Sequence, residues 1–148
     1  MEMEAGTLLT DLSKYFDCIM HDLLIAKLEA FGFNHLSLKL IQSYLTDRYQ
    51  RVRINSQYSS WSEIIYGVPQ GSILGSILFN IYMCDLFLFL QDSQIANYAD
   101  ENLPFSCNSA IDSVLCKLDI DCQIIIEWIR NNGLKANPDK FHLLLGDN

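Results

Sequence analysis

An adjacent pair of carboxylates, Asp100 and Glu101, is the feature of this sequence that most directly suggests chemistry. Short runs with apolar residues stand on both sides, at 94–97 and 103–105, and two such runs around a polar turn are typical of a β-hairpin. Carboxylate oxygens at the tip of a tight turn are suitable ligands for a hard divalent cation. The site needs a further carboxylate, and Asp11 is the best candidate. We therefore predict a metal site built from two distant parts of the chain.

The elements before the pair must bring Asp11 into position. A strand is predicted over Gly6–Asp11 and would carry Asp11 to the edge of a sheet. The next helix is capped by Asp22 and ends at Phe31-Gly32, and a second helix runs from about His35 to Leu45 and packs against it. The first helix is predicted to place Leu24, Leu28 and Phe31 on one face.

A hairpin with a basic cluster is predicted next. Gln50–Ile54 alternates polar with apolar residues, as a half-exposed strand does, and it turns back toward Trp61–Ile65. Arg48, Arg51 and Arg53 form the basic cluster, and a strand would point the last two to the same side. Contact with a nucleic-acid backbone and a solvated strand face are both open interpretations.

The most apolar segment, Ile73–Leu90, is long enough to raise the question of a membrane span. Asn80 and Asp85 lie inside it, and an ionised carboxylate is costly in lipid. We therefore expect a buried core helix and no membrane association, with a membrane-associated protein as the weaker alternative.

The last long helix has a capping box at Ser109 and Asp112 and ends at 131–133. A closing strand follows at Phe141–Leu145. This order of elements predicts an α+β fold, with helices packed on one face of a mostly antiparallel sheet. The apolar stripe of the helix is predicted to comprise Ile111, Leu115, Leu118, Cys122, Ile125 and Ile129.

The length, composition and net charge of the chain limit the classes of protein to which it can belong. A chain of 148 residues, half of them apolar, is expected to form one domain over 1–148. Its net charge of -8 is the wrong sign for holding a polyanion. Five cysteines without a C-x-x-C pair favour reduced thiols in an intracellular protein, and the acidic start argues against a signal peptide. The sequence does not choose between nucleus and cytoplasm.

Three blocks in this order resemble the palm of a reverse transcriptase of the non-LTR, LINE-like retrotransposon kind. They are Asp11–Asp17 (D-L-S-K-Y-F-D), Tyr66–Asp85, which contains G-V-P-Q-G-S, and Tyr98–Glu101 (Y-A-D-E). Trp128–Leu145 resembles the block that follows them, so the similarity covers nearly the whole chain. The resemblance implies a partial RNA-directed DNA polymerase, in which the basic fingers and the thumb belong to the rest of a longer polymerase chain. Its implied partners are an RNA template, a DNA primer and deoxynucleoside triphosphates.

The resemblance also implies roles for the acidic residues. Asp11 and Asp100, with Glu101 beside them, would bind two magnesium ions that activate the primer hydroxyl and neutralise the leaving pyrophosphate. Lys140 matches a lysine that lies near the leaving phosphate and can donate a proton. Without the resemblance, Lys140 and Asp100 would be read as turn residues and Asp11 as a cap.

A nucleotide-binding group is implied in the same way, comprising Leu12, Phe16, Gln70 and Gly71. Phe16 resembles the aromatic gate that excludes a 2'-hydroxyl, although a core aromatic is the alternative. Glycine at Gly71 permits close backbone approach, and the helix that follows offers free N-H groups. A plain Pro-Gly loop is the alternative there.

Several positions depart from the family pattern. Glu101 stands where a second aspartate is usual, and its extra methylene displaces the carboxylate by roughly 1.5 Å, a shift that can damage a positioned site. Tyr15, Met20 and Ser76 are also unusual. Two hypotheses follow: a catalytic palm that needs fingers and thumb, and a non-catalytic retroelement remnant that at most folds or binds partners.

Overall fold

The computed structural model describes residues 4–9, 14–91, 93–98 and 101–147. It divides the chain into two compact units. The first unit comprises Met1–Tyr15 with Met83–Asn148, and the second comprises Phe16–Tyr82. The assignment of 1–148 to a single domain stays a prediction.

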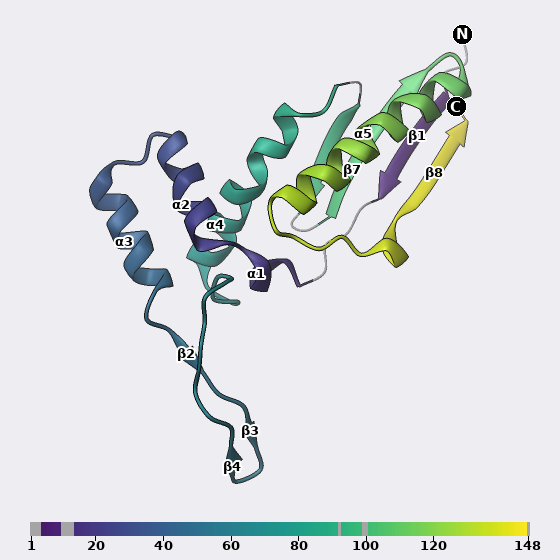
Figure 1. The fold of residues 1–148 in the computed structure, drawn as a ribbon. Helices are drawn as coiled ribbons and strands as arrows, with labels where there is room; N and C mark the ends of the chain where they lie inside the picture. The colour runs from purple at the N-terminus through teal and green to yellow at the C-terminus, as the bar shows by residue number, and fades with distance from the viewer. Residues whose placement is uncertain (1–3, 10–13, 92, 99–100, 148) are drawn as a thin grey trace. The chain divides into compact units, whose positions relative to one another are not determined.

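A four-stranded sheet forms the first unit. Its strand order is β6 (Gln94–Tyr98), β7 (Glu101–Asn108), β1 (Glu4–Leu9) and β8 (His142–Asp147), and each neighbouring pair is antiparallel. Helix α5 (Ile111–Asn131) packs on β1 and β7 and lies along one face of the sheet (Figure 1). The predicted α+β fold is confirmed.

Gly6 lets α5 approach β1 closely. A Cβ atom added at Gly6 would lie 2.7 Å from Cγ1 of Val114 and 2.8 Å from Cδ1 of Leu118. The two side chains occupy the space that a larger residue on β1 would fill, so glycine is required here by packing. The buried residues of α5 are Val114, Leu118, Asp121, Ile125, Trp128 and Ile129.

The predicted details of α5 need two corrections. Its N-cap is Ala110 and no side chain caps it, because the amide and the hydroxyl of Ser109 both donate to Oδ1 of Asn108, at 2.7 and 3.3 Å. The predicted capping box is therefore wrong. The predicted apolar stripe is right at Leu118, Ile125 and Ile129, whereas its other members are only half-buried.

The second unit contains the helices α2 (His21–Ala30) and α3 (His35–Leu45) and most of α4 (Ile73–Met83). Helices α2 and α3 pack against each other, as the sequence predicts. Asp22 does not cap α2, since the N-cap is Met20 and makes no side-chain hydrogen bond. Phe31 ends the helix as predicted but is exposed, because it lies beyond the buried face.

The segment Ile73–Leu90 is less buried than predicted. Helix α4 ends at Met83, and a 3-10 helix, η1 (Cys84–Leu88), follows it. Phe79 is buried, but Ile73 is 84% exposed and Leu88 80% exposed. Within the described residues, no helix combines the length and hydrophobicity of a membrane span.

A hairpin extends from the second unit, away from α2 and α3 (Figure 1). At the base of the hairpin β2 (Tyr49–Gln50) pairs with β5 (Ser62–Glu63), and near its tip β3 (Arg53–Ile54) pairs with β4 (Gln57–Tyr58). Every residue of 49–63 is exposed. The predicted half-exposed strand is therefore wrong, since both faces of this hairpin are solvated.

Candidate active site

Three parts of the predicted site, Asp11, the Asp100–Glu101 pair and Lys140, lie in or next to segments at one end of the four-stranded sheet. Thr7 pairs with Phe105 and Leu9 with His142, so β1 ends where β7 and β8 begin. Tyr98 pairs with Glu101, so β6 ends there too. All four strands therefore have a terminus at this end of the sheet.

The carboxylates Asp11 and Asp100 lie outside the described residues, as does Leu12. The chain leaves β1 two positions before Asp11, and β7 begins one position after Asp100, at Glu101. Convergence of these side chains stays a prediction.

Lys140 belongs to the same end of the sheet. It is the last residue of the 3-10 helix η2 (Pro138–Lys140), whose backbone turn is closed by the Lys140 amide donating to the oxygen of Asn137 at 3.0 Å. The lysine is exposed and stands two residues before β8, which begins beside Leu9. The structure thus brings Lys140 to the strand ends that lead to the acidic positions.

Asp121 is a carboxylate that the sequence did not single out. It is fully buried on α5 and accepts hydrogen bonds from the backbone amides of Gln91, at 3.0 Å, and Ser93, at 2.7 Å. These bonds fix the segment that enters β6. The sequence could have indicated it only as an acidic residue at a position of the helix that is spaced like the buried ones. Its hydrogen-bond partners lie about 30 positions away in the chain.

In the second unit, the backbone joins the segment after Phe16 to the loop before Gln70. The amide of Val68 donates to the oxygen of Phe16 at 2.8 Å, and the amide of Gly67 donates to the oxygen of Ile19 at 2.8 Å. His21 Nε2 donates to the oxygen of Gly67 at 2.7 Å. Two of the resembling blocks are therefore neighbours.

Gly67 is required by this close approach. Its φ is +84°, and an added Cβ would lie 2.7 Å from the oxygen of Phe16. A larger residue would be strained and would also clash with backbone. The spacing of the loop from Phe16 is thus set by glycine.

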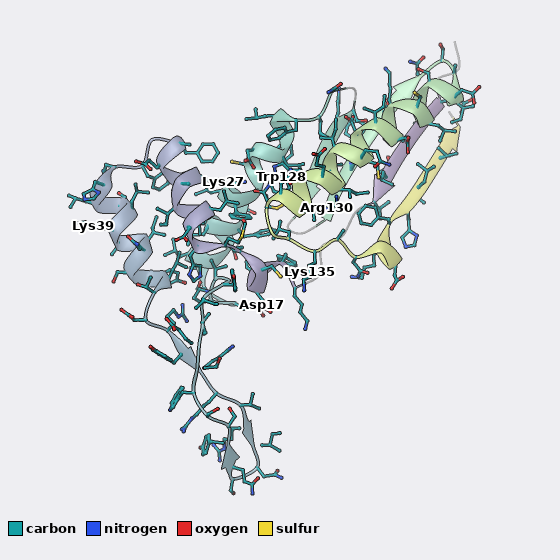
Figure 2. The ribbon with its side chains drawn as sticks, in the orientation of Figure 1. Asp17, Lys27, Lys39, Trp128, Arg130 and Lys135 are labelled. Carbon is teal, nitrogen blue, oxygen red and sulfur yellow. The ribbon has the colours of Figure 1, made fainter. Side chains whose placement is uncertain are left out.

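The side chains of Phe16 and Gln70 are held by different contacts. The ring of Phe16 is half-buried, with its centroid 5.2 Å from that of Phe79 and the two planes tilted by 48°. Gln70 is exposed and its Nε2 donates to Oδ1 of Asp17 at 2.9 Å. Asp17, labelled in Figure 2, lies on α1 (Tyr15–Cys18). Phe16 therefore has the packing expected of a core aromatic on one side.

Ser72 fixes the junction between this loop and α4. Its hydroxyl donates to the oxygen of Pro69 at 3.0 Å, accepts from the amide of Gly75 at 2.9 Å, and lies 2.8 Å from the hydroxyl of Tyr44. Gly71 has a φ of +78°, and nothing lies within 4 Å of an added Cβ. The backbone at Gly71 is therefore open to approach, whereas its neighbours are anchored.

The described residues contain no group of three or more His, Cys, Asp or Glu that could hold a metal ion. The predicted metal ligands Asp11 and Asp100 lie outside the described residues.

A family model described as reverse transcriptase (RNA-dependent DNA polymerase) matches residues 2–147. The chain is 30% identical over 137 residues to a probable RNA-directed DNA polymerase from transposon BS of Drosophila melanogaster, covering 88% of this chain and 15% of that protein. It is 26% identical over 136 residues to a retrovirus-related Pol polyprotein from type-1 retrotransposable element R2 of Popillia japonica, covering 88% of this chain and 22% of that protein.

The fold is similar to that of apo telomerase from Candida tropicalis. The TM-score is 0.72 at 17% sequence identity, and the match covers 97% of this chain and 31% of the telomerase chain. At that identity, the likeness concerns the fold alone.

Proposed function

We propose that this chain, which belongs to the reverse transcriptase (RNA-dependent DNA polymerase) family, forms the catalytic palm of an RNA-directed DNA polymerase of the non-LTR retrotransposon kind. The reaction joins a deoxynucleoside triphosphate to a DNA primer on an RNA template and releases pyrophosphate. The chain spans 15% and 22% of the two retrotransposon relatives above. Fingers and thumb are therefore to be supplied by the rest of a longer polymerase.

The observation that supports this proposal most is the register of the sheet. It brings the end of β1, the start of β7 and the η2 turn to one end of the sheet. The residues proposed for catalysis, Asp11, Asp100, Glu101 and Lys140, lie in or next to these segments. Segments far apart in sequence could thus serve one reaction centre.

The proposed metal ligands are Asp11 and Asp100, with Glu101 as a further carboxylate. Carboxylate oxygens suit hard magnesium ions, so the donor set fits the metal. When bound, two such ions supply charge neutralisation and an activated primer hydroxyl. Lys140, exposed at the same sheet end, would hold the proton that the leaving pyrophosphate takes up.

The proposed nucleotide-binding group is Leu12, Phe16, Gln70 and Gly71. Packing against Phe79 orients the ring of Phe16, and this ring would exclude a ribose 2'-hydroxyl. The hydrogen bond from Gln70 to Asp17 orients the loop, and the open space at Gly71 would admit the nucleotide. Each of these residues would act by its position and would neither gain nor lose a proton.

A non-catalytic remnant is the second candidate function, and Glu101 is the observation that favours it. A glutamate carboxylate stands one methylene further from the backbone than that of an aspartate, and misplacement by about 1 Å can cost on the order of 100-fold in rate. The chain alone, with a net charge of -8, is expected to extend no primer, since little basic charge is present to grip a duplex.

The test is to replace the palm of an active retrotransposon polymerase with residues 1–148 and to measure primer extension with magnesium. We expect weak extension with Glu101 and on the order of 100-fold more with Glu101→Asp. Asp11→Ala in the Glu101→Asp chimera is the matched control and should abolish extension. A folded chimera that is equally inactive in both forms would favour the remnant.

A further inference from the structure

The hairpin of residues 48–63 concentrates positive charge on an acidic chain. It carries three of the four arginines, Arg48, Arg51 and Arg53, and no acidic residue occurs before Glu63. The chain as a whole has a net charge of -8. A local positive charge, on a segment in which every residue from 49 to 63 is exposed, favours an anionic partner.

The arginines are layered on aromatic rings. Cζ of Arg51 lies 3.9 Å from the ring centroid of Tyr58 and 4.6 Å from that of Trp61. Cζ of Arg53 lies 5.5 Å from the same tyrosine ring, and its Nε donates to the oxygen of Asn55 at 3.0 Å. These contacts hold planar guanidinium groups in place before any partner binds.

The rings remain accessible in spite of these contacts. Trp61 is 61% exposed and Tyr58 is 49% exposed. Exposed aromatic side chains next to arginine are the elements with which proteins hold single strands, because unpaired bases stack on rings and guanidinium planes while the positive charge follows the phosphates. A duplex offers the phosphates but not the base faces.

We propose that this hairpin binds an unpaired nucleic-acid strand, with a base stacked on the Arg51, Tyr58 and Trp61 layer and phosphates beside Arg48 and Arg53. That this strand is the template rests on the proposed function. A protein partner is the rival, since Val52 and Ile54 are also exposed. The excess of positive charge, with three arginines against Glu63 alone in residues 48–63, and the layered guanidinium groups favour the nucleic acid.

The test uses the whole 148-residue chain and a fluorescein-labelled RNA of about 16 nucleotides without self-pairing, the upper range of single-strand site sizes. Anisotropy is measured without magnesium or nucleotide, over a series of salt concentrations. DNA of the same sequence and an RNA duplex are the comparison probes. We expect both single strands to bind and the duplex to bind at least fivefold more weakly, because one stacked base contributes about that factor.

Variants separate stacking from charge. Trp61→Ala should weaken binding about fivefold or more at unchanged salt dependence. Arg51→Lys keeps the charge but loses the planar stack, so it should also weaken binding without changing the salt slope. Arg53→Ala should reduce the slope by roughly 0.7, the value for one phosphate contact on a single strand. Lys39→Ala, an exposed charge change on α3 (Figure 2), is the matched control and should leave binding unchanged.

Three results would overturn the proposal: no binding of either single strand, equal binding of the duplex, or loss of affinity in Lys39→Ala equal to that in Arg53→Ala. Thermal unfolding of each variant checks that it folds, and the exposed positions make a change there unexpected. The assay contains no magnesium or nucleotide and measures no synthesis. Its outcome is therefore separate from that of the chimera, which reports on the acidic site.

Discussion

The four-stranded sheet and the hairpin of residues 48–63 are both antiparallel, yet they are stabilised in different ways. The sheet is packed on α5, and Val114 and Leu118 of the helix fill the space where a Cβ atom at Gly6 of β1 would lie. The hairpin has no buried residue and is stabilised by backbone pairing and arginine-aromatic contacts. Substitutions in the sheet should therefore lower stability, whereas substitutions in the hairpin should affect binding alone.

The largest effect is expected at Gly6. Gly6→Val should lower the free energy of unfolding by about 3 kcal/mol, because its side chain overpacks the contact between β1 and α5. Chemical denaturation measures this change. Gly146→Val on β8 is the control, since nothing lies within 4 Å of its added Cβ, and it should be nearly neutral. Equal losses in the two variants would contradict the packing account.

Asp121 should come next. Asp121→Ala removes the acceptor of two partly buried backbone hydrogen bonds, from the amides of Gln91 and Ser93. We expect a loss of about 2–3 kcal/mol in the free energy of unfolding. Asp119→Ala, an exposed position on the same helix, should change stability by less than about 0.5 kcal/mol. A neutral Asp121→Ala would show that the sheet does not depend on this carboxylate.

The reactivity of Cys122 tests how far α5 and the four-stranded sheet bury this thiol. Partial burial at a pocket of about 280 Å³, with a smaller contribution from the charge of Asp119, raises the pKa of the Cys122 thiol. A thiol with a raised pKa holds less reactive thiolate near pH 8. Cys122 should therefore react with a disulfide reagent more slowly than Cys107 and Cys116, which are exposed. Mass spectrometry of the labelled peptides measures this order, and an equal rate at all three would contradict it.

The smallest effect is expected in the hairpin. Trp61→Ala should leave the free energy of unfolding within about 0.5 kcal/mol of the parent, because the residue is exposed. The same denaturation experiment measures it. A loss as large as that of Gly6→Val would mean that the hairpin is part of the core.

Local patterns predict much of this fold. The bounds of the helix at His35–Leu45 are as predicted, because its periodicity and its Asn34 cap lie within a few residues. The strand predicted over Gly6–Asp11 is found at Glu4–Leu9, and β6 pairs with β7 as the predicted hairpin requires. These features depend on neighbours in the chain, which a sequence displays directly.

Features that depend on distant partners are not predicted. The burial of Asp121 depends on amides about 30 positions away, and the exposure of Ile73 depends on what α4 packs against. The cap of α5 fails for a local reason, because Asn108 competes for Ser109. In the candidate site, the resemblance implies that Phe16 and Gln70 belong to one nucleotide-binding group. It does not give the contacts of their side chains with Phe79 and Asp17.

The most direct measurement of the proposed site is manganese binding to the 148-residue chain carrying Glu101→Asp, followed by electron paramagnetic resonance. If Asp11 and Asp100 share their cations, Asp11→Ala and Asp100→Ala should each weaken binding by a similar large factor, whereas Asp119→Ala should not. Parental binding in either of the first two variants would contradict a metal site shared between these carboxylates.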